Sequence, residues 1–277
     1  MKKILEVKKL KKSYGDFVLG PVDGSFPGGV IVGLIGENGA GKTTFIKSLL
    51  KILQAEGEIQ FFSNKKEDIG VVLDNSFFPE ILTAEDIHKI MKNIYKNWDS
   101  SLFFSYLEKF SLPKNKAIKN LSKGMRKKLE IVTALSHHPK FLILDEPTSG
   151  LDPVVRKEVL DLFLDFIQDE DHTILLSTHI TSDLEHIADY ILFLDKGKVV
   201  LEETQDVIMD TYGILKCGKD EFSKISKEDV WRYSESRYGY EILVKDRDKI
   251  KKKYPNMIVD KITLEDLMVF VVKGRIL

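Results

Sequence analysis

The chain has 277 residues, with 42 Lys and Arg against 43 Asp and Glu and a formal net charge of −1. This balance excludes nucleic-acid binding that depends on overall positive charge, so we expect no nucleic-acid partner. The single cysteine, Cys217, excludes an internal disulfide and a cysteine-based zinc site, which suits a reducing compartment. No stretch reaches the ~20 apolar residues that span a bilayer, so any membrane role requires a separate protein.

Glycine and proline divide the first 75 or so residues into short predicted strands. These strands are Ile4–Leu10, Asp23–Phe26, Val30–Ile35, Glu58–Phe62 and Ile69–Leu73. From Thr83 to Ser136 the apolar residues follow helical spacing instead. Strands and helices then alternate, with strands at Phe141–Leu144, Thr173–Ser177, Tyr190–Leu194 and Lys198–Leu201 and helices at Pro153–Gln168 and Ser182–Ala188.

Two local patterns refine this last region. Ser182 and Glu185 have the spacing of a capping box at the start of a helix. Lys196-Gly197 lies between two apolar strands and predicts a hairpin. The fully apolar strands predict a buried, mostly parallel sheet with helices on its faces, which is an α/β fold.

The predicted organisation is a large unit over residues 1–208 and a small α+β unit over 209–277. The large unit combines the parallel sheet with an antiparallel β-subdomain and an α-helical subdomain at about 75–136. The small unit has strands near Tyr240–Val244 and Met257–Ile262. Its basic run Lys245–Lys253 is expected to be a solvated helix face, with a membrane-surface or regulatory contact as the alternative. The apolar segment Leu264–Val272 offers a possible homodimer contact.

A phosphate-binding loop is predicted between an apolar strand and a helical pattern, where Gly36–Thr43 has the spacing G-x-x-x-x-G-K-[ST]. Such a loop wraps a polyphosphate with backbone N–H groups, and the helix N-terminus adds positive charge. We expect Lys42 to reach the β- and γ-phosphates and the Thr43 hydroxyl to bind Mg²⁺. The alternative is a tight turn with a chance lysine. The predicted nucleotide-binding residues here are Gly36, Glu37, Asn38, Gly39, Ala40, Gly41, Lys42, Thr43 and Thr44.

The apolar strand Phe141–Leu144 ends in two adjacent carboxylates, Asp145 and Glu146. Consecutive residues at a strand end point in different directions. One carboxylate can therefore hold Mg²⁺ while the other faces the γ-phosphate and orients an attacking water. We assign Asp145 to the metal and Glu146 to the water. A strand that merely ends in solvated acids is the alternative, and it is less common for a pair of acids.

Three further motifs follow in order: Leu121–Met125, Ser149–Asp152 and Ser177–His179. With the loop and the paired acids, they make the sequence from Met1 to about Glu203 resemble the nucleotide-binding subunit of an ABC transporter, in the bacterial exporter-like subgroup. The resemblance implies that Ser177–His179 supplies a switch histidine that contacts the γ-phosphate.

The same resemblance places Asp152 in the D-loop, although a purely structural helix cap is the alternative for this residue. It also implies that Tyr14 stacks on adenine, for which packing at a strand end is the alternative.

The resemblance also implies a head-to-tail dimer, with each ATP between one phosphate-binding loop and the other subunit's signature helix. The dimer is either a homodimer or a pair with a second cassette. The cofactors implied are ATP and Mg²⁺, and the partner is a separately encoded transmembrane permease at the cytoplasmic face of the cell membrane. The signature residues that would face the other subunit's ATP are Ser122, Lys123, Gly124 and Met125.

The sequence departs from the family pattern at three positions. Lys123 and Met125 stand where the family usually has Gly and Gln, and Asp74 stands where it has a glutamine that touches Mg²⁺. Asp74 is therefore a candidate metal ligand. Phe77 and Phe78 follow it and are candidates for a docking groove that receives the transmembrane partner. The aromatic residues expected in the core of the helical subdomain are Trp98, Phe103, Phe104 and Phe110.

Together these patterns predict an ATPase that energises transport, with export of peptides, drugs or lipids expected. Its catalytic residues would be Lys42, Glu146 and His179. The alternative is a soluble ATPase of the same type, for example in cluster assembly, that works without a membrane partner.

Overall fold

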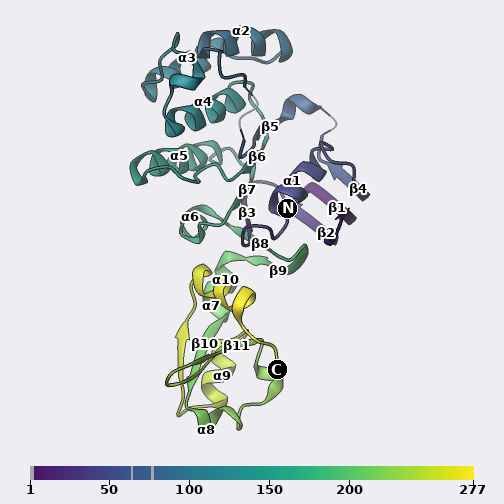
Figure 1. Cartoon of the computed structure of the whole chain (residues 1–277), viewed down its shortest axis with the longest axis vertical. Helices are drawn as coiled ribbons and strands as arrows, with labels where there is room; N and C mark the ends of the chain where they lie inside the picture. The colour runs from purple at the N-terminus through teal and green to yellow at the C-terminus, as the bar shows by residue number, and fades with distance from the viewer. Residues whose placement is uncertain (1–2, 64, 76–77) are drawn as a thin grey trace.

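The computed structural model describes residues 3–63, 65–75 and 78–277. Its central sheet has the strand order β5-β6-β7-β3-β8-β9, in which neighbours are parallel except in the β8–β9 hairpin (Figure 1). This order brings together three strands that lie far apart in the sequence, β3, β7 and β6. The strands are β3 (Ile31–Ile35), β5 (Ile69–Val72), β6 (Phe141–Asp145), β7 (Thr173–Thr178), β8 (Tyr190–Asp195) and β9 (Lys198–Thr204). The predicted α/β fold with a mostly parallel sheet is confirmed.

The central strands are apolar on both faces because helices cover both faces. Alternate residues of β3 belong to different cores: Ile31 and Ile35 pack with the residues of α5 (Pro153–Phe166) and α6 (Thr181–Ile187). Val32 and Leu34 pack instead with α1 (Lys42–Leu49) and the antiparallel sheet. A strand buried in this way shows a continuous apolar run rather than alternation, which explains why the sequence located these strands.

The antiparallel sheet has the order β2-β1-β4 and consists of β1 (Lys3–Tyr14), β2 (Phe17–Pro27) and β4 (Glu56–Phe61). β1 and β2 are longer than the predicted strands. The pairing register shifts between Val7 and Leu10, and Lys9 has a positive φ of 49°. A bulge of this kind interrupts the alternation of apolar and polar residues, so the sequence pattern ends before the strand does.

The helical subdomain lies at one end of the molecule, where three helices surround a core of their own (Figure 1). The three helices begin with side-chain caps at Thr83, Asp99 and Ser122, in chain order. The expected core aromatics all pack into this cluster, with Phe103 fully buried. The helices are α2 (Ala84–Ile94), α3 (Ser100–Lys109) and α4 (Lys123–Leu135), with short 3₁₀ turns at Lys66–Asp68 and Ile118–Asn120.

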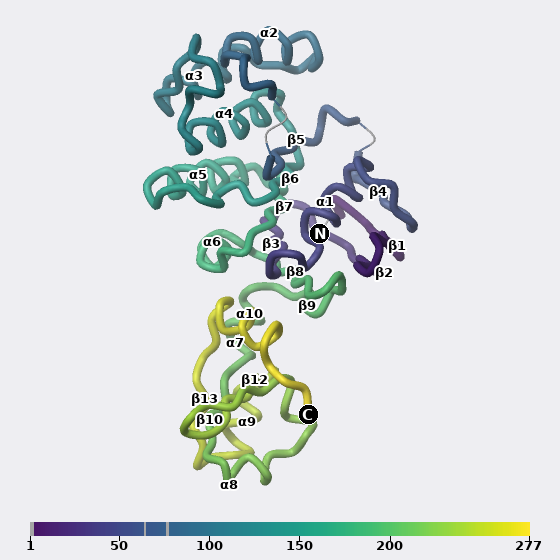
Figure 2. The backbone as a smooth tube through the Cα atoms, in the orientation of Figure 1, coloured from purple at the N-terminus to yellow at the C-terminus, as the bar shows by residue number. Residues whose placement is uncertain are grey.

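The C-terminal residues form a second antiparallel sheet of order β11-β12-β10-β13 at the opposite end of the molecule from α2 and α3 (Figure 2). α9 packs against one face of this sheet, where Ile250 is buried with Leu215 and Ile242. No helix in the described part of the chain is long and apolar enough to cross a membrane. The elements are α7 (Gln205–Thr211), β10 (Gly213–Cys217), α8 (Lys219–Phe222), a 3₁₀ turn (Lys227–Asp229), β11 (Arg232–Ser236), β12 (Gly239–Val244), α9 (Arg247–Lys253), β13 (Ile258–Lys261) and α10 (Leu264–Lys273).

α10 packs against α6 of the large unit. Leu264 and Leu267 are fully buried in the same core as Leu184 and Ile187. The apolar side of the segment 264–272 is therefore covered by the chain itself. This corrects the expectation that the segment offers a homodimer contact.

The predicted capping box at Ser182 and Glu185 is wrong. α6 begins at Thr181, one residue earlier, so these two residues do not occupy capping positions. The Glu185 carboxylate instead accepts a hydrogen bond of 2.6 Å from the backbone N–H of Leu264, at the start of α10. Ser182 accepts a hydrogen bond from Arg156. Both side chains therefore bind partners from other elements and not the N-terminus of their own helix.

A buried histidine makes the stability of the fold depend on pH. His137 is 2% exposed, and its ring stacks on Tyr95 with 4.1 Å between the ring centroids. Burial lowers the pKa of His137, whereas a histidine in the unfolded chain titrates near 6.5. The unfolded chain therefore binds the proton that the folded chain rejects, so the stability is present above about pH 6.5 and is lost as the pH falls below it.

We expect the free energy of unfolding to fall by up to about 1.4 kcal/mol per pH unit for this histidine below about pH 6. His137→Gln keeps a donor for the Ile69 carbonyl oxygen, which lies 3.3 Å from Nε2, and should reduce the slope. Chemical denaturation at several pH values between 7.5 and 5.5 measures this slope of the free energy of unfolding against pH. The exposed His186, changed to Gln, is the control. An equal slope in wild type and His137→Gln would contradict the assignment.

Candidate site for nucleotide binding and hydrolysis

The carboxyl ends of β3, β7 and β6 meet at one edge of the central sheet, because the three strands are adjacent and parallel. β3 leads into the loop 36–41, which turns sharply into α1. Gly36 and Gly41 have φ angles of 154° and 109°. A Cβ atom on Gly36 would collide with the carbonyl oxygen of Leu194. Glycine is therefore required where the loop passes closest to β8.

The loop surrounds the Lys42 side chain, which is only 5% exposed. Its ammonium donates hydrogen bonds to the carbonyl oxygens of Gly36 at 2.8 Å and Glu37 at 3.3 Å. Gly41 occupies the N-cap position of α1 and, having no side chain, offers no cap to the first N–H groups. Thr43 and Thr44 lie half-buried in that first turn. The loop thus presents a cation, hydroxyl groups and a helix N-terminus together, which is the chemistry that binds phosphate.

Glu146 is the residue at which the three strand ends meet. One carboxylate oxygen lies 3.3 Å from Nζ of Lys42, and the other lies 2.8 Å from Nδ1 of His179. Its backbone N–H donates to the Ser177 carbonyl oxygen at 3.0 Å. Glu146 also has a positive φ of 49°, which is uncommon for a residue with a side chain. The structure brings together Lys42, Glu146 and His179, the three residues predicted to be catalytic.

Asp145 is fully buried and has different partners from Glu146. One of its carboxylate oxygens, Oδ1, accepts a hydrogen bond from the Ser177 hydroxyl. Within the described residues, the other oxygen, Oδ2, has no hydrogen-bond partner. A buried carboxylate oxygen normally has a partner, so Asp145 is suited to a cation. No cluster of three or more His, Cys, Asp or Glu side chains in the described ranges could hold a metal alone. A divalent ion here would need oxygen ligands from the substrate or water.

The other candidate metal ligand, Asp74, is exposed and lies just beyond β5, the strand beside β6. The backbone here is held by Lys127 of α4, whose ammonium donates to the carbonyl oxygens of Leu73 at 3.0 Å and Asp74 at 3.4 Å. Lys127 is 5% exposed and pairs with Glu130 at 3.2 Å. Sequence reasoning missed Lys127; its charge at an inward position of an amphipathic helix was the available signal. Phe77 lies outside the described residues.

Tyr14 lies at the turn between β1 and β2, where it pairs with Phe17. The Phe17 ring is in turn packed against Gly41 of the phosphate-binding loop. The Tyr14 ring is 43% exposed, and the Lys12 ammonium lies 5.0 Å from its centroid. An exposed aromatic ring close to this loop has room to stack on a base.

The signature residues begin α4. The Ser122 hydroxyl accepts a hydrogen bond of 3.2 Å from the Met125 N–H and so caps the helix. The Lys123 side chain extends over Gly150, so that a Cβ atom on Gly150 would collide with the Lys123 ammonium. Gly124 faces Val155 of α5. The signature segment and the segment that contains the predicted D-loop therefore lie side by side in one chain.

Asp152 caps α5. Its carboxylate accepts hydrogen bonds of 3.1 Å from the N–H groups of Val154 and Val155. The sequence also predicted that Pro153 would be the first residue of this helix, and it is. This capping geometry accounts for an aspartate at position 152 without a partner subunit.

The fold and the loop define a P-loop nucleoside triphosphatase. Residues 19–149 match the model of the family described as ABC transporter. The lantibiotic transport ATP-binding protein SrtF of Streptococcus pyogenes is 34% identical over 212 residues, which cover 73% of this chain and 92% of that protein.

Solved structures resemble the same region. An ATP-binding subunit of an ABC transporter aligns with a TM-score of 0.67 at 29% identity, over 74% of this chain and 91% of that one. A dimeric ATP-binding cassette in a post-hydrolysis state, bound to ADP and Pi, aligns with a TM-score of 0.64 at 22% identity, over 73% of this chain and 98% of that one, and shows a shared fold. The chain belongs to the ABC transporter family, as an ATP-binding subunit that hydrolyses ATP.

Proposed function

We propose that this ATPase uses Lys42, Glu146 and His179 as its hydrolysis centre and acts on a separately encoded transmembrane permease. The observation that supports the centre most directly is the Glu146 carboxylate, which contacts both Lys42 and His179. Lys42 and the N–H groups of the loop bind the phosphates of ATP. Glu146 acts as the base or positions the attacking water, and His179 contacts the γ-phosphate. Tyr14 stacks on the adenine.

Thr43 and Asp145 are the proposed ligands of Mg²⁺, with Asp74 as a further candidate. The buried Oδ2 of Asp145, which lacks a hydrogen-bond partner in the described chain, supports this assignment. When bound, the metal would neutralise negative charge on the β- and γ-phosphate oxygens. Asp145 itself is held in place by the Ser177 hydroxyl, so its free oxygen has a fixed direction.

The competent species is a head-to-tail dimer, in which Ser122, Lys123, Gly124 and Met125 face the ATP of the other subunit. The capped N-terminus of α4 supports this role, since such a terminus attracts phosphate. The Lys123 cation lies in the first turn, where it adds positive charge. Asp152 belongs to the D-loop between the two subunits. ATP binding closes the dimer and hydrolysis reopens it.

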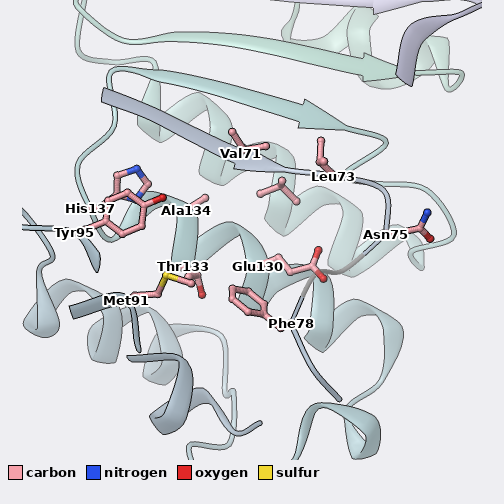
Figure 3. A pocket seen from close by; sticks show the side chains of 11 residues that line it. Val71, Leu73, Asn75, Phe78, Met91, Tyr95, Glu130, Thr133, Ala134 and His137 are labelled. Carbon is pink, nitrogen blue, oxygen red and sulfur yellow. The ribbon is translucent and has the colours of Figure 1, made fainter. Parts of the chain in front are cut away.

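The permease is proposed to dock in a groove of about 220 Å³ where the helical subdomain meets the central sheet (Figure 3). Val71 of β5 lies at one side of the groove, and Phe78, from the segment after β5, lies next to Glu130 of α4 at the opposite side (Figure 3). Met91 and Tyr95 of the helical subdomain line the groove farther along (Figure 3). A mostly apolar groove that contains a carboxylate suits the end of a partner helix. Phe78 is one of the two aromatic residues that the sequence suggested for docking.

We propose that the chain works peripherally at the cytoplasmic face of the membrane and supports export. The lantibiotic transport name of the relative in Streptococcus pyogenes favours a peptide cargo. The alternative function, a soluble ATPase for cluster assembly, has no support among these relatives.

The catalytic role of Glu146 is tested by Glu146→Gln. This change keeps the size of the side chain and removes the basic charge, so kcat should fall by about 10²- to 10⁴-fold. ATP affinity should change little, because Lys42 and the loop remain, and closed dimers should accumulate. Phosphate release and size-exclusion chromatography with ATP are the measurements. The control is Glu158→Gln, which removes a carboxylate from a lysine pair outside the site. Normal turnover by Glu146→Gln would refute the assignment.

The shared site is tested by mixing two inactive variants. Lys42→Ala disables a subunit's own phosphate-binding loop, and Ser122→Asp places a negative charge where the other subunit's phosphate would lie. A mixed dimer retains one intact site, formed by the loop of one variant and the signature of the other. We therefore expect the mixture to regain ATPase activity, and wild-type activity to rise faster than linearly with protein concentration. If the mixture stays inactive and wild-type activity rises only linearly with protein concentration, the proposed dimer is wrong.

The docking groove is tested by Val71→Arg. Val71 is 37% exposed at the rim, so the change should leave ATP binding by the purified protein intact. It should reduce recovery of the chain with membranes when it is co-expressed with the proposed transmembrane permease. Val269→Arg changes a valine of α10 that is 46% exposed and serves as the control. Equal recovery of the two variants would rule out this groove.

A further inference from the structure

A buried carboxylate outside the proposed hydrolysis centre joins the two loops that carry Glu146 and His179. Asp183 lies on α6, four residues after His179, and is 2% exposed. One of its oxygens accepts a hydrogen bond of 2.6 Å from the Thr148 hydroxyl. The other accepts a hydrogen bond of 2.5 Å from Nε of Arg156, in the first turn of α5. The charge is thus paired, and both oxygens have partners.

Thr148 is the link to the catalytic carboxylate. It is 1% exposed and lies two residues after Glu146, in the turn that leads to α5. The Ser149 N–H donates to the Glu146 carbonyl oxygen at 3.3 Å, and the Leu151 N–H donates to the Thr148 carbonyl oxygen at 3.2 Å, so the turn is compact. Arg156 fixes the far end of the same segment, because its N–H donates to the Asp152 carbonyl oxygen at 2.9 Å.

The strand ladder alone does not hold the two catalytic loops together. β6 and β7 pair as far as Asp145 and Ser177, and the Ser177 hydroxyl bonds to Asp145 at this last pair. Beyond it, the Glu146 N–H still donates to the Ser177 carbonyl oxygen, and the chains then separate into different turns. The bond from Thr148 to Asp183 joins them again on the far side. Two hydroxyl–carboxylate bonds therefore flank the contact between Glu146 and His179. The bond from Ser177 to Asp145 precedes it along the two chains, and the bond from Thr148 to Asp183 follows it.

We infer that Asp183 is a positioning residue for ATP hydrolysis, which acts through Thr148 and Arg156 to keep Glu146 and His179 in register. The inference rests on the proposed hydrolysis centre. Asp183 touches neither residue of the pair directly. Its two bonds fix the loop after Glu146 to the helix after His179. Catalysis is sensitive to such placement, because a shift of about 1 Å at a reacting group can reduce the rate about 10²-fold.

The first test is Asp183→Asn. An amide has one acceptor oxygen and one donor nitrogen, so it cannot accept from both Thr148 and Arg156. We expect kcat to fall about 10- to 100-fold. The KM for ATP should stay within about threefold, since Lys42 and its loop are untouched. The kcat is expressed per folded molecule, so a role confined to stability would leave it unchanged.

A second pair of variants keeps the charge pair between Asp183 and Arg156. Thr148→Val removes only the hydroxyl and should lower kcat, whereas Thr148→Ser keeps the hydroxyl and should restore it. The effects of Thr148→Val and Asp183→Asn should not add in the double variant, because both break the same bond. These changes remain informative if Asp183→Asn folds poorly.

Asp229 supplies a matched control in the C-terminal unit. It is also a buried carboxylate that accepts from one hydroxyl, Tyr254 at 2.8 Å, and one cation, Lys253 at 2.6 Å. Asp229→Asn should lower the melting temperature and leave kcat unchanged.

Wild-type kcat in folded Asp183→Asn and Thr148→Val would overturn the inference, as would loss of kcat in Thr148→Ser equal to that in Thr148→Val. Glu146→Gln is assayed beside them. If it hydrolyses ATP normally, the proposed centre is wrong; if it is inactive while the Asp183 and Thr148 variants are normal, only the positioning role fails.

Discussion

The candidate site depends on one carboxylate that lies between side chains from two other strand ends. Glu146 contacts Lys42 from the phosphate-binding loop and His179 from the end of β7. These residues are distant in the sequence, and only the order of adjacent parallel strands brings them to one edge of the sheet. The strands are held by α5 and α6 on one face and by α1 and the antiparallel sheet on the other. The geometry of the site therefore depends on the packing of the core, because a shift between β3, β6 and β7 would separate Lys42, Glu146 and His179.

Much of this arrangement could be predicted from residues alone. The apolar strands that enter the loop and the paired acids are buried on both faces, so their sequences show uninterrupted apolar runs. The phosphate-binding loop has a strict spacing because its glycines and lysine each meet a steric or chemical requirement. The caps at Ser122 and Asp152 were visible for the same reason, since a helix start favours a short polar side chain. Patterns of this kind depend only on residues close together in the sequence, so the structure retains the features that they predict.

What the sequence did not predict depends on contacts between distant segments. Ser182 and Glu185 have the spacing of a local cap, but other elements recruit both side chains. Lys127 resembles an ordinary solvated lysine in the sequence, yet its side chain is buried against the backbone after β5. Asp183 carried no motif at all. In each case a polar residue is explained by a partner far along the chain, which periodicity cannot identify.

The way α10 rests on α6 limits how this chain can be divided. Leu184 and Ile187 of the large unit belong to a core that is completed by residues beyond 260. A cut after β9 would open that core to water and remove the N–H group that satisfies Glu185. The C-terminal residues thus complete the core of the large unit and also form a small fold of their own. In a cassette excised without them, α6, the helix that follows His179, would lose part of its packing.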